Sequence, residues 1–512
     1  MKTINTYLFK LGMFCAAGTL VISSCSKNND NPLGPIAPID ESIAGPNVSL
    51  FALSSTNQLL SFNAQNPAAT TPIAITGLAS GETILAIDFR PATGQLYGVS
   101  TTSSIYTINT TTGAARIVGT GPFTPVIGSN VLGFDFNPTV DRIRLVTSNG
   151  QNLRLHPETG ATAAVDGVIN GVTNPGVTSA AYTQNRAGAS ATILYVIDIN
   201  NDKLYKQDPP NDGKLVEVGS IGFDIQQAAD FDISPSGVAF ASLKKAGVTN
   251  LYTIDLNTGK ATRIKNDFSG NIIGLAIPTE PVAYAVSSAN ELVVFNPMTG
   301  TSVAKAISGV VAGETILGLD FRPATGQLYG LGSSSRIYVF NTSTGAATAV
   351  GAAPFATLLT GTDFGFDFNP TVDRIRIVSN TGQNLRVVPT DGTIAFIDGA
   401  LSPGTPSITA AAYTNSFAGA TTTTLFDIDT QTNKLYKQDP PNTGTLVEVG
   451  SLGVTATATN GFDIGGTSGT AYALLTVGGV TKVYTINLTT GAATAGATLT
   501  GTFKAFALGL GF

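Results

Sequence analysis

The side chains best able to do chemistry lie in one polar stretch that occurs twice, from Asp135 to Arg144 and from Asp367 to Arg376. Carboxylate, amide and guanidinium groups surround a Pro-Thr turn, and Gln, Asn and Arg follow on the next expected strand. Because Arg can bind a carboxylate or phosphate through two parallel hydrogen bonds, the stretch predicts a site for a carboxylate, phosphate or sugar. The candidate ligand-binding residues are Asp135, Asn137, Asp141, Arg142, Arg144, Gln151, Asn152, Arg154, Asp367, Asn369, Asp373, Arg374, Arg376, Gln383, Asn384 and Arg386.

The favoured alternative for these residues is structural. Period-two alternation puts Arg142 and Arg144 on one face of a strand and Ile143 on the other. Asp and Arg side chains arranged in this way can form a network that pins a hairpin together. The ligand site stays open beside this interpretation, because the other repeated segments carry only parts of the Asp, Asn and Arg pattern.

A second cluster of oxygen side chains runs from Asp198 to Asp202 and resembles a calcium loop. Its copy, Asp429 to Asn433, has lost a carboxylate, and neither copy has a Gly at the bend or a distal Glu. We therefore expect a hairpin turn, with calcium near Asp198 and Asp202 as the weaker alternative. No other metal or cofactor is expected.

Several catalytic chemistries are excluded by composition. The cysteines are Cys15 and Cys25, both near the N-terminus, so the rest of the chain has no thiol for catalysis or zinc binding. The single histidine, His156, has Val388 as its counterpart, which rules out a duplicated Ser-His-Asp triad. A pair of carboxylates of the glycosidase type stays open, with Glu82 and Asp88 or Asp135 and Asp141 as possible members.

The chain after the N-terminal segment is a tandem duplication. Phe89 to Gly98 recurs unchanged at 321–330, Gly133 to Arg144 at 365–376, and Leu204 to Asn211 at 435–442. The near-constant spacing predicts one unit at 47–278 and another at 279–512. Within each unit, short apolar runs alternate with turn signals such as Pro-Ala-Thr-Gly, which is typical of all-β proteins.

A smaller period divides each unit into five phrases of about 46 residues, the length of a four-stranded propeller blade. The first phrase has three strands, and residues 272–277 and 504–510 are unpaired apolar runs. A late strand that completes the first blade closes a ring and removes the sheet edges. Two tandem five-bladed β-propellers are therefore favoured. One ten-bladed ring is the alternative, and a sandwich or solenoid a remoter one.

The N-terminal segment predicts export and lipidation. Lys2 and Lys10 give a positively charged start, and the uncharged apolar run from Leu11 to Ile22 that follows is too short to span a bilayer. Val21 to Ser24 then precede Cys25, as in a bacterial lipobox. We expect a signal peptide at 1–24, a lipidated Cys25, and a Pro-rich tether to residue 46. This places the protein at the outer membrane, on its periplasmic face or at the cell surface.

The net charge of −6 and the charged fraction of 12% argue against nucleic acid as a partner. The absence of Trp weakens the case for sugar stacking. Partners expected instead are the membrane, through the lipid, and an unidentified protein or glycan. The oligomeric state stays open.

The repeated motifs resemble a bacterial family known as domain of unknown function 4394. The resemblance rests on Asp88 to Tyr97, Gly133 to Arg144 with Gly150 to Arg154, the Ala180 to Thr183 strand and the Pro-Pro-Asn turn, and covers nearly all of 47–512. It implies no activity. Single-copy members imply that one unit can close on itself.

These observations favour a non-catalytic binding or scaffold module of the cell envelope, with no catalytic residues assigned. The alternative is a hydrolase or lyase that acts on extracellular polysaccharide through carboxylates at a propeller mouth. A third possibility is a structural role in the envelope.

Overall fold

The computed structural model describes residues 42–512 apart from 267, 269 and 270, and the expected signal peptide and most of the tether lie outside these residues. The described chain consists of β-strands and two short 3-10 turns, Pro210–Asp212 (η1) and Pro441–Thr443 (η2). No described helix is long and apolar enough to cross a membrane. The all-β prediction is confirmed.

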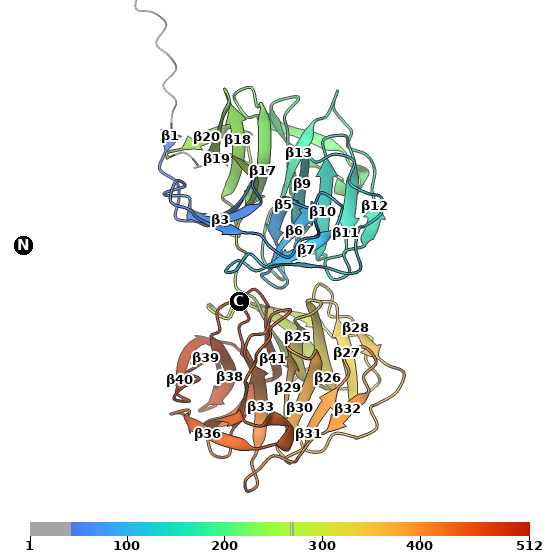
Figure 1. Ribbon diagram of the computed structural model, residues 1–512, viewed down its shortest axis with the longest axis vertical. Helices are drawn as coiled ribbons and strands as arrows, with labels where there is room; N and C mark the ends of the chain where they lie inside the picture. Colours follow the sequence, from blue (N-terminus) through green and yellow to red (C-terminus); the bar gives the residue numbers. More distant parts are fainter. Residues whose placement is uncertain (1–41, 267, 269–270) are drawn as a thin grey trace, which may run out of the picture. The chain divides into compact units, whose positions relative to one another are not determined.

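The first ring contains five blades, shown from blue to green in Figure 1. The closing blade is made of β21 (Ile272–Ala276), β2 (Ser49–Ser54), β3 (Gln58–Asn63) and β4 (Thr71–Ala74). The second blade is made of β5 (Ile84–Phe89), β6 (Leu96–Ser100), β7 (Ile105–Ile108) and β8 (Ala115–Ile117). The third blade is made of β9 (Leu132–Asn137), β10 (Arg142–Thr147), β11 (Asn152–Leu155) and β12 (Thr162–Val165). The fourth blade is made of β13 (Val177–Tyr182), β14 (Leu194–Asp198), β15 (Lys203–Gln207) and β16 (Leu215–Ser220). The fifth blade is made of β17 (Gln227–Ile233), β18 (Ala239–Lys245), β19 (Val248–Ile254) and β20 (Ala261–Ile264). The short strand β1 (Ser42–Ile43) pairs with β20 in parallel.

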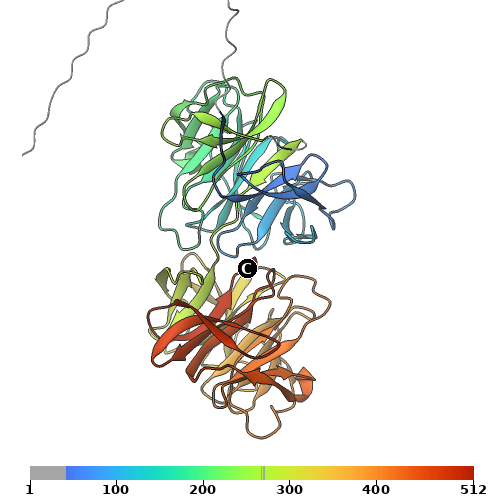
Figure 2. The same cartoon turned by 90° about the vertical axis from the view of Figure 1, so that its left-hand side faces the viewer.

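The second ring repeats this order and runs from olive to red in Figures 1 and 2. Its closing blade is made of β41 (Phe503–Leu508), β22 (Ala283–Ser287), β23 (Glu291–Phe295) and β24 (Ser302–Ala306). The second blade is made of β25 (Ile316–Arg322), β26 (Gln327–Gly332), β27 (Arg336–Phe340) and β28 (Ala347–Val350). The third blade is made of β29 (Phe364–Asn369), β30 (Arg374–Ser379), β31 (Asn384–Val387) and β32 (Ile394–Ile397). The fourth blade is made of β33 (Ile408–Tyr413), β34 (Leu425–Asp429), β35 (Lys434–Gln438) and β36 (Leu446–Ser451). The fifth blade is made of β37 (Ala456–Ile464), β38 (Ala471–Val477), β39 (Val480–Ile486) and β40 (Ala493–Thr498).

Each ring is closed by a late strand that completes its first blade. Strand β21 pairs with β2 in the first unit and β41 pairs with β22 in the second, both antiparallel. The innermost strands contact one another in a closed cycle, β5-β9-β13-β17-β21 and β25-β29-β33-β37-β41. The prediction of two five-bladed propellers is therefore confirmed, and the ten-bladed alternative is wrong.

Apolar faces of neighbouring blades form the core of each ring. Phe134 and Phe136 of β9 pack with Tyr97 and Val99 of the preceding blade, all of them buried. The Tyr97 and Phe136 rings meet edge to face at 5.1 Å, and Tyr329 and Phe368 do the same in the second ring. Burial of such aromatic pairs stabilises the contact by more than their area alone, so each blade depends on its neighbours.

We predict that residues 47–278 fold alone, because the fragment contains all five blades and its own closing strand. Differential scanning calorimetry should show one cooperative unfolding transition. The shorter fragment 47–271 lacks β21, which exposes the inner edge of β2, and it should aggregate. Aggregation of 47–278 under conditions where the full chain is soluble would contradict independent closure.

Candidate functional site

The sequence-predicted polar residues do not converge on one site. The structure distributes them over four places: the axis of each ring, a contact between two blades at the β9–β10 turn, a network between β10 and the next blade, and the long connection that leads into β9. The same distribution recurs in the second copy.

At the axis, Asp135 accepts a hydrogen bond from the backbone N–H of Tyr182 on the next innermost strand, at 3.1 Å. Asp88 does the same for Phe136 at 2.8 Å, and Asp232 for Ile277 at 2.6 Å. An innermost strand is the edge of its sheet, so N–H groups that face the next blade have no partner within their own blade. The carboxylates supply that partner and join one blade to the next.

The second ring repeats this arrangement. Asp320, Asp367 and Asp463 accept hydrogen bonds from the amides of Phe368, Tyr413 and Leu508, at 2.7, 3.0 and 2.6 Å. Asp135 and Asp367 were among the predicted site residues, whereas Asp232, Asp320 and Asp463 were missed. The signal was present, since every one of these aspartates stands alone between two apolar residues, where an unpaired charge is costly.

Burial dominates the electrostatics of the axis. It raises the pKa of Asp88 and of Asp135 well above the ordinary value, and repulsion from neighbouring aspartates adds to the effect. Burial also raises the pKa of Asp232 to about 7, with the amides of Ile277 and Ile233 acting in the opposite direction. Burial likewise raises the pKa of Asp320, Asp367 and Asp463 in the second ring.

At the β9–β10 turn, Asp141 pairs with Arg90 of the preceding blade. Arg90 Nε lies 2.9 Å from Asp141 Oδ1, and Arg90 is fully buried. Arg322 and Asp373 make the same pair at 2.9 Å in the second ring. Asn137 and Asn369 accept hydrogen bonds from Thr139 and Thr371 within this turn, and Arg142 and Arg374 donate to the carbonyls of Asp141 and Asp373.

The third place is a network around Arg144, which is 2% exposed. Its guanidinium donates to Asp166 at 2.7 Å, Asn152 at 2.6 Å and, on the next blade, Asn211 at 2.8 Å. Arg154 holds Asp166 through two further bonds at 2.8 and 2.9 Å. Asn211 belongs to the Pro-Pro turn, so that turn anchors one blade to another.

In the second ring the same network forms from Arg376, Asp398, Asn384, Asn442 and Arg386. Nearly every polar atom of these side chains has a protein partner. The Asp–Arg network thus ties neighbouring blades together, rather than pinning a single hairpin.

Gln151 and Gln383 have a different role, because each holds a long connection between blades. Gln151 accepts a hydrogen bond from the N–H of Gly128 at 3.0 Å and donates to the carbonyl of Val126 at 2.9 Å. Gln383 makes the equivalent bonds with Thr360 and Leu358. Val126 and Leu358 occupy the same position in the two units, and each is 61% exposed.

The other carboxylates considered from the sequence are also engaged. Asp198 Oδ1 accepts hydrogen bonds from the amides of Gly176, Asn200 and Asn201, and Asp202 accepts one from Ile225 at 2.7 Å. In the second copy Asn433 accepts the equivalent bond from Ala456 at 2.7 Å, so this position requires an acceptor oxygen and no charge.

Glu82 is held by three hydroxyl groups. Ser100, Thr102 and Tyr106 donate to its carboxylate, and these bonds outweigh burial and lower its pKa. The Tyr106 pKa is raised to about 12, by burial first and then by its bond to Glu82. Glu82 therefore serves the fold of its own blade.

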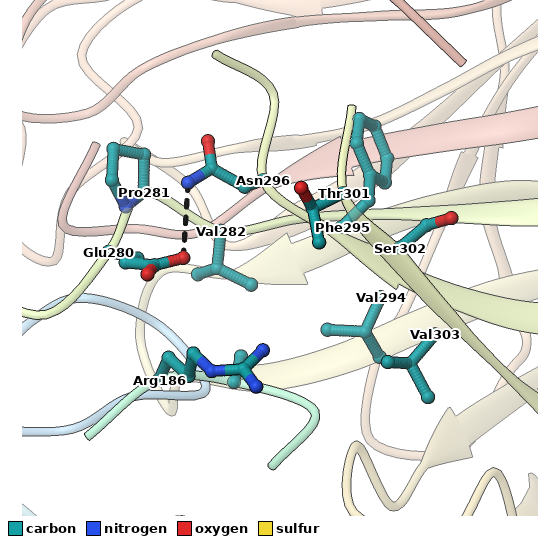
Figure 3. Close-up of a pocket in the computed structure, with 11 residues that line it drawn as sticks. Arg186, Glu280, Pro281, Val282, Val294, Phe295, Asn296, Thr301, Ser302 and Val303 are labelled. Carbon is teal, nitrogen blue, oxygen red and sulfur yellow. Dashed lines mark hydrogen bonds between the residues drawn. The ribbon is translucent and has the colours of Figure 1, made fainter. Parts of the chain in front are cut away.

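One small pocket borders the first strands of the second ring (Figure 3). Val282, Val294 and Phe295 contribute apolar walls, and Asn296 donates a hydrogen bond to Glu280 at 3.2 Å. Its volume of about 20 Å³ is the space of one water molecule. This pocket has no room for an organic ligand.

The comparison with family models gives two tandem matches. The model described as a domain of unknown function (DUF4394) matches residues 58–276 and again 283–508. The comparison with curated proteins gives no match.

Solved structures give distant likenesses. The extracellular domain of the one-component system BT4673 from B. thetaiotaomicron is 12% identical, with a TM-score of 0.26, 91% of this chain covered and 61% of that one. PorZ, a surface component of the type-IX secretion system of Porphyromonas gingivalis, is 13% identical with a TM-score of 0.26, at 90% and 59% coverage. The chain thus spans about three fifths of the length of these structures.

We predict that Asp427→Val stabilises the second ring. Asp427 is fully buried on β34, between Ala411 and Tyr436, with no hydrogen-bond partner for either oxygen among the described residues, and Val196 is its counterpart. Burial raises the pKa of Asp427 to about 8, partly offset by Arg376. The substitution should add about 1–3 kcal/mol to the free energy of unfolding.

The increase in the free energy of unfolding caused by Asp427→Val should grow with pH. The folded state keeps the proton up to about pH 8, whereas the unfolded state releases it near its ordinary value, so Asp427 costs more stability as pH rises between these values. Urea unfolding of the wild type and the variant at pH 5 and pH 8 measures the difference. Val196→Asp is the reverse control and should destabilise the first ring. An equal gain at both pH values would contradict the burial of an ionisable carboxyl group here.

Proposed function

The chain belongs to the family described as a domain of unknown function (DUF4394), and we propose that it is a cell-envelope lipoprotein that binds an extracytoplasmic protein without transforming it. The proposal combines an exported, lipid-anchored N-terminus with two rigid rings that display loops. We favour a protein over a small molecule as the ligand because exposed apolar side chains recur at equivalent loop positions in the two rings.

The observation that carries the proposal is the pair Val126 and Leu358. Each lies on the connection that leads into the third blade of its ring, β9 to β12 or β29 to β32, and each is 61% exposed. A Gln side chain bonds that connection at two backbone points in both copies. A single exposed apolar residue is ordinary, but two at equivalent places on braced loops form a repeated contact of fixed geometry.

Rigid presentation favours binding, because little conformational entropy is lost when a preorganised loop meets its partner. The contacts between blades at Arg90 and Arg144 provide this rigidity. The carboxylates that could have acted in polysaccharide hydrolysis, Asp135 and Asp141, are engaged with Tyr182 and Arg90. Two copies of one contact also permit bivalent binding, which raises avidity without new contacts.

Lipidation is tested at the N-terminus of the protein purified from membranes. Intact-mass and peptide mass spectrometry should show that the mature chain starts at Cys25 with a diacylglycerol on its thiol. Cys25→Ala should release the protein from the membrane fraction, because it removes the thiol that would carry the lipid. An unmodified start at Ser26, or cleavage elsewhere, would refute the anchor.

Protein binding is tested by photo-crosslinking on intact cells, with the reactive residue placed at position 126 or 358. We expect both positions to give the same discrete adduct. With the reactive residue at position 126, Leu358→Ser should weaken adduct formation at least about tenfold, and Val126→Ser should do the same with the reactive residue at position 358, as for the loss of an anchor side chain. The control positions are Val248 and Val480, an equivalent exposed pair on the β18–β19 and β38–β39 hairpins.

Adducts at 248 and 480 as strong as those at 126 and 358 would count against the proposed surface. The enzymatic alternative is tested in parallel with residues 26–512 and a panel of extracellular glycans. Cleavage that is lost in Asp135→Asn and Asp367→Asn, while both variants keep the wild-type unfolding temperature, would overturn the non-catalytic proposal.

A further inference from the structure

Three aspartates from three different blades meet at the axis of each ring. In the first ring one oxygen each from Asp88, Asp135 and Asp232 lies within 4.8 Å of the other two. The residues come from β5, β9 and β17, so two neighbouring blades and one across the ring contribute. Each is at most 3% exposed. Asp320, Asp367 and Asp463 form the same trio in the second ring.

The negative charge of these trios has no basic partner. None of the ion pairs found among the described residues involves any of the six aspartates. Each carboxylate gives one oxygen to an amide of the next blade, and the second oxygen of Asp232 and of Asp463 accepts the amide of the residue that follows it, Ile233 or Ile464. For Asp88 that second oxygen, Oδ1, is buried without any hydrogen-bond partner. A buried carboxylate oxygen without a partner is costly, and a bound cation is one way to supply that partner.

We propose that each trio binds a divalent cation of the calcium type at the axis of its ring. Carboxylate oxygens are the preferred ligands of such hard cations. Calcium–oxygen distances of about 2.3–2.6 Å allow two ligands of one ion to lie up to about 5 Å apart. Oxygens within 4.8 Å of one another therefore fit around a single ion.

Comparison of the two copies supports a shared requirement for the whole trio. Other buried polar positions differ between the copies: Asp230 is replaced by Gly461, and Val196 by Asp427. The trio is present in both. The two remaining innermost strands carry Ala181 and Ala276 at the equivalent place, and Ala412 and Ala507 in the second ring, so the third ligand must come from across the axis.

A cation at this place would join blades that share no strand pairing. Strand β17 neither pairs with nor lies next to β5 or β9 in the order of the ring. A common ion would connect all three innermost strands at one point and neutralise two of the three carboxylate charges. The expected result is a ring whose stability depends on the cation, as for structural metal sites in general.

The test uses residues 26–512, which lack the lipidated Cys25, unfolded in denaturant with a chelator and refolded with calcium, with magnesium or with the chelator alone. After desalting, inductively coupled plasma mass spectrometry should find two calcium ions per chain. Calorimetry should show that 1 mM calcium raises the unfolding temperature by at least about 5 °C over the chelated protein.

Substitutions assign the ions to the trios. Asp88→Asn keeps an oxygen for the Phe136 amide but removes a charge, and it should reduce the content from two ions to one. Asp320→Asn should do the same for the second ring, and the double variant should retain none. Asp230→Asn is the matched control. Asp230 lies on the same strand as Asp232, is 1% exposed and accepts a hydrogen bond from the Leu275 amide, but it is outside the trio. The Asp230→Asn variant should therefore keep both ions.

Three results would overturn the proposal. The first is a refolded wild type without bound metal and with the same unfolding temperature in calcium and chelator. The second is a double variant that still holds two ions, which would place them elsewhere. The third is a metal-free wild type that is more stable than its metal-free Asn variants, because the carboxylates would then be satisfied by shared protons and not by a cation. If Asp88→Asn fails to fold, Asp320→Asn and the wild-type measurements decide the question.

Discussion

The innermost strands of each ring form no strand pairing with one another, yet they must hold together at the axis. Every four-stranded blade ends there in an edge whose backbone N–H groups face a neighbouring blade. Asp88, Asp135 and Asp232 solve this problem by accepting those N–H groups across the gap. A carboxylate is a strong acceptor for a backbone amide, and burial between apolar blades strengthens the bond further. These bonds join three of the five pairs of neighbouring innermost strands in the first ring.

The same solution creates an electrostatic problem. Bringing three carboxylates to one axis raises the pKa of each, because the site is dry and like charges are close together. Away from the axis the molecule avoids this cost by pairing: Asp141 faces Arg90, and Asp166 faces Arg144 and Arg154. The contrast is informative, since at the periphery an arginine of the preceding blade pairs with Asp141 and two arginines of its own blade pair with Asp166, whereas no arginine pairs with the carboxylates at the centre.

Much of the fold could be predicted from the sequence because its evidence is repetitive. Phe89 to Gly98 and its copy establish the duplication, and the late apolar run at 272–277 predicts closure by β21. Period-two alternation correctly placed Arg142 and Arg144 on one face. It could not show that Arg144 is buried while Arg142 is partly exposed, since that depends on Asn211 arriving from the next blade, 67 residues later in the chain.

The candidate site was harder to predict for the same physical reason. Contacts within a hairpin follow from spacing, whereas contacts between blades depend on how far each blade rotates about the axis. Asp135 and Asp141 are close in sequence, yet one points to the axis and the other to the preceding blade. Asp232 is far from both in sequence but meets Asp135 at the axis. A local motif therefore reveals polar residues that matter without showing which of them act together.

The differences between the two copies separate what the fold requires from what it tolerates. His156 is replaced by Val388, and Asp202 by Asn433, with the local hydrogen bond to the next blade kept in the second case. At the axis no such exchange of Asp for Asn occurs, although an amide oxygen would satisfy the facing N–H equally well. Hydrogen bonding alone thus explains an acceptor at these six positions but not the charge. The charge needs a second reason, and a positive partner at the centre of each ring provides one.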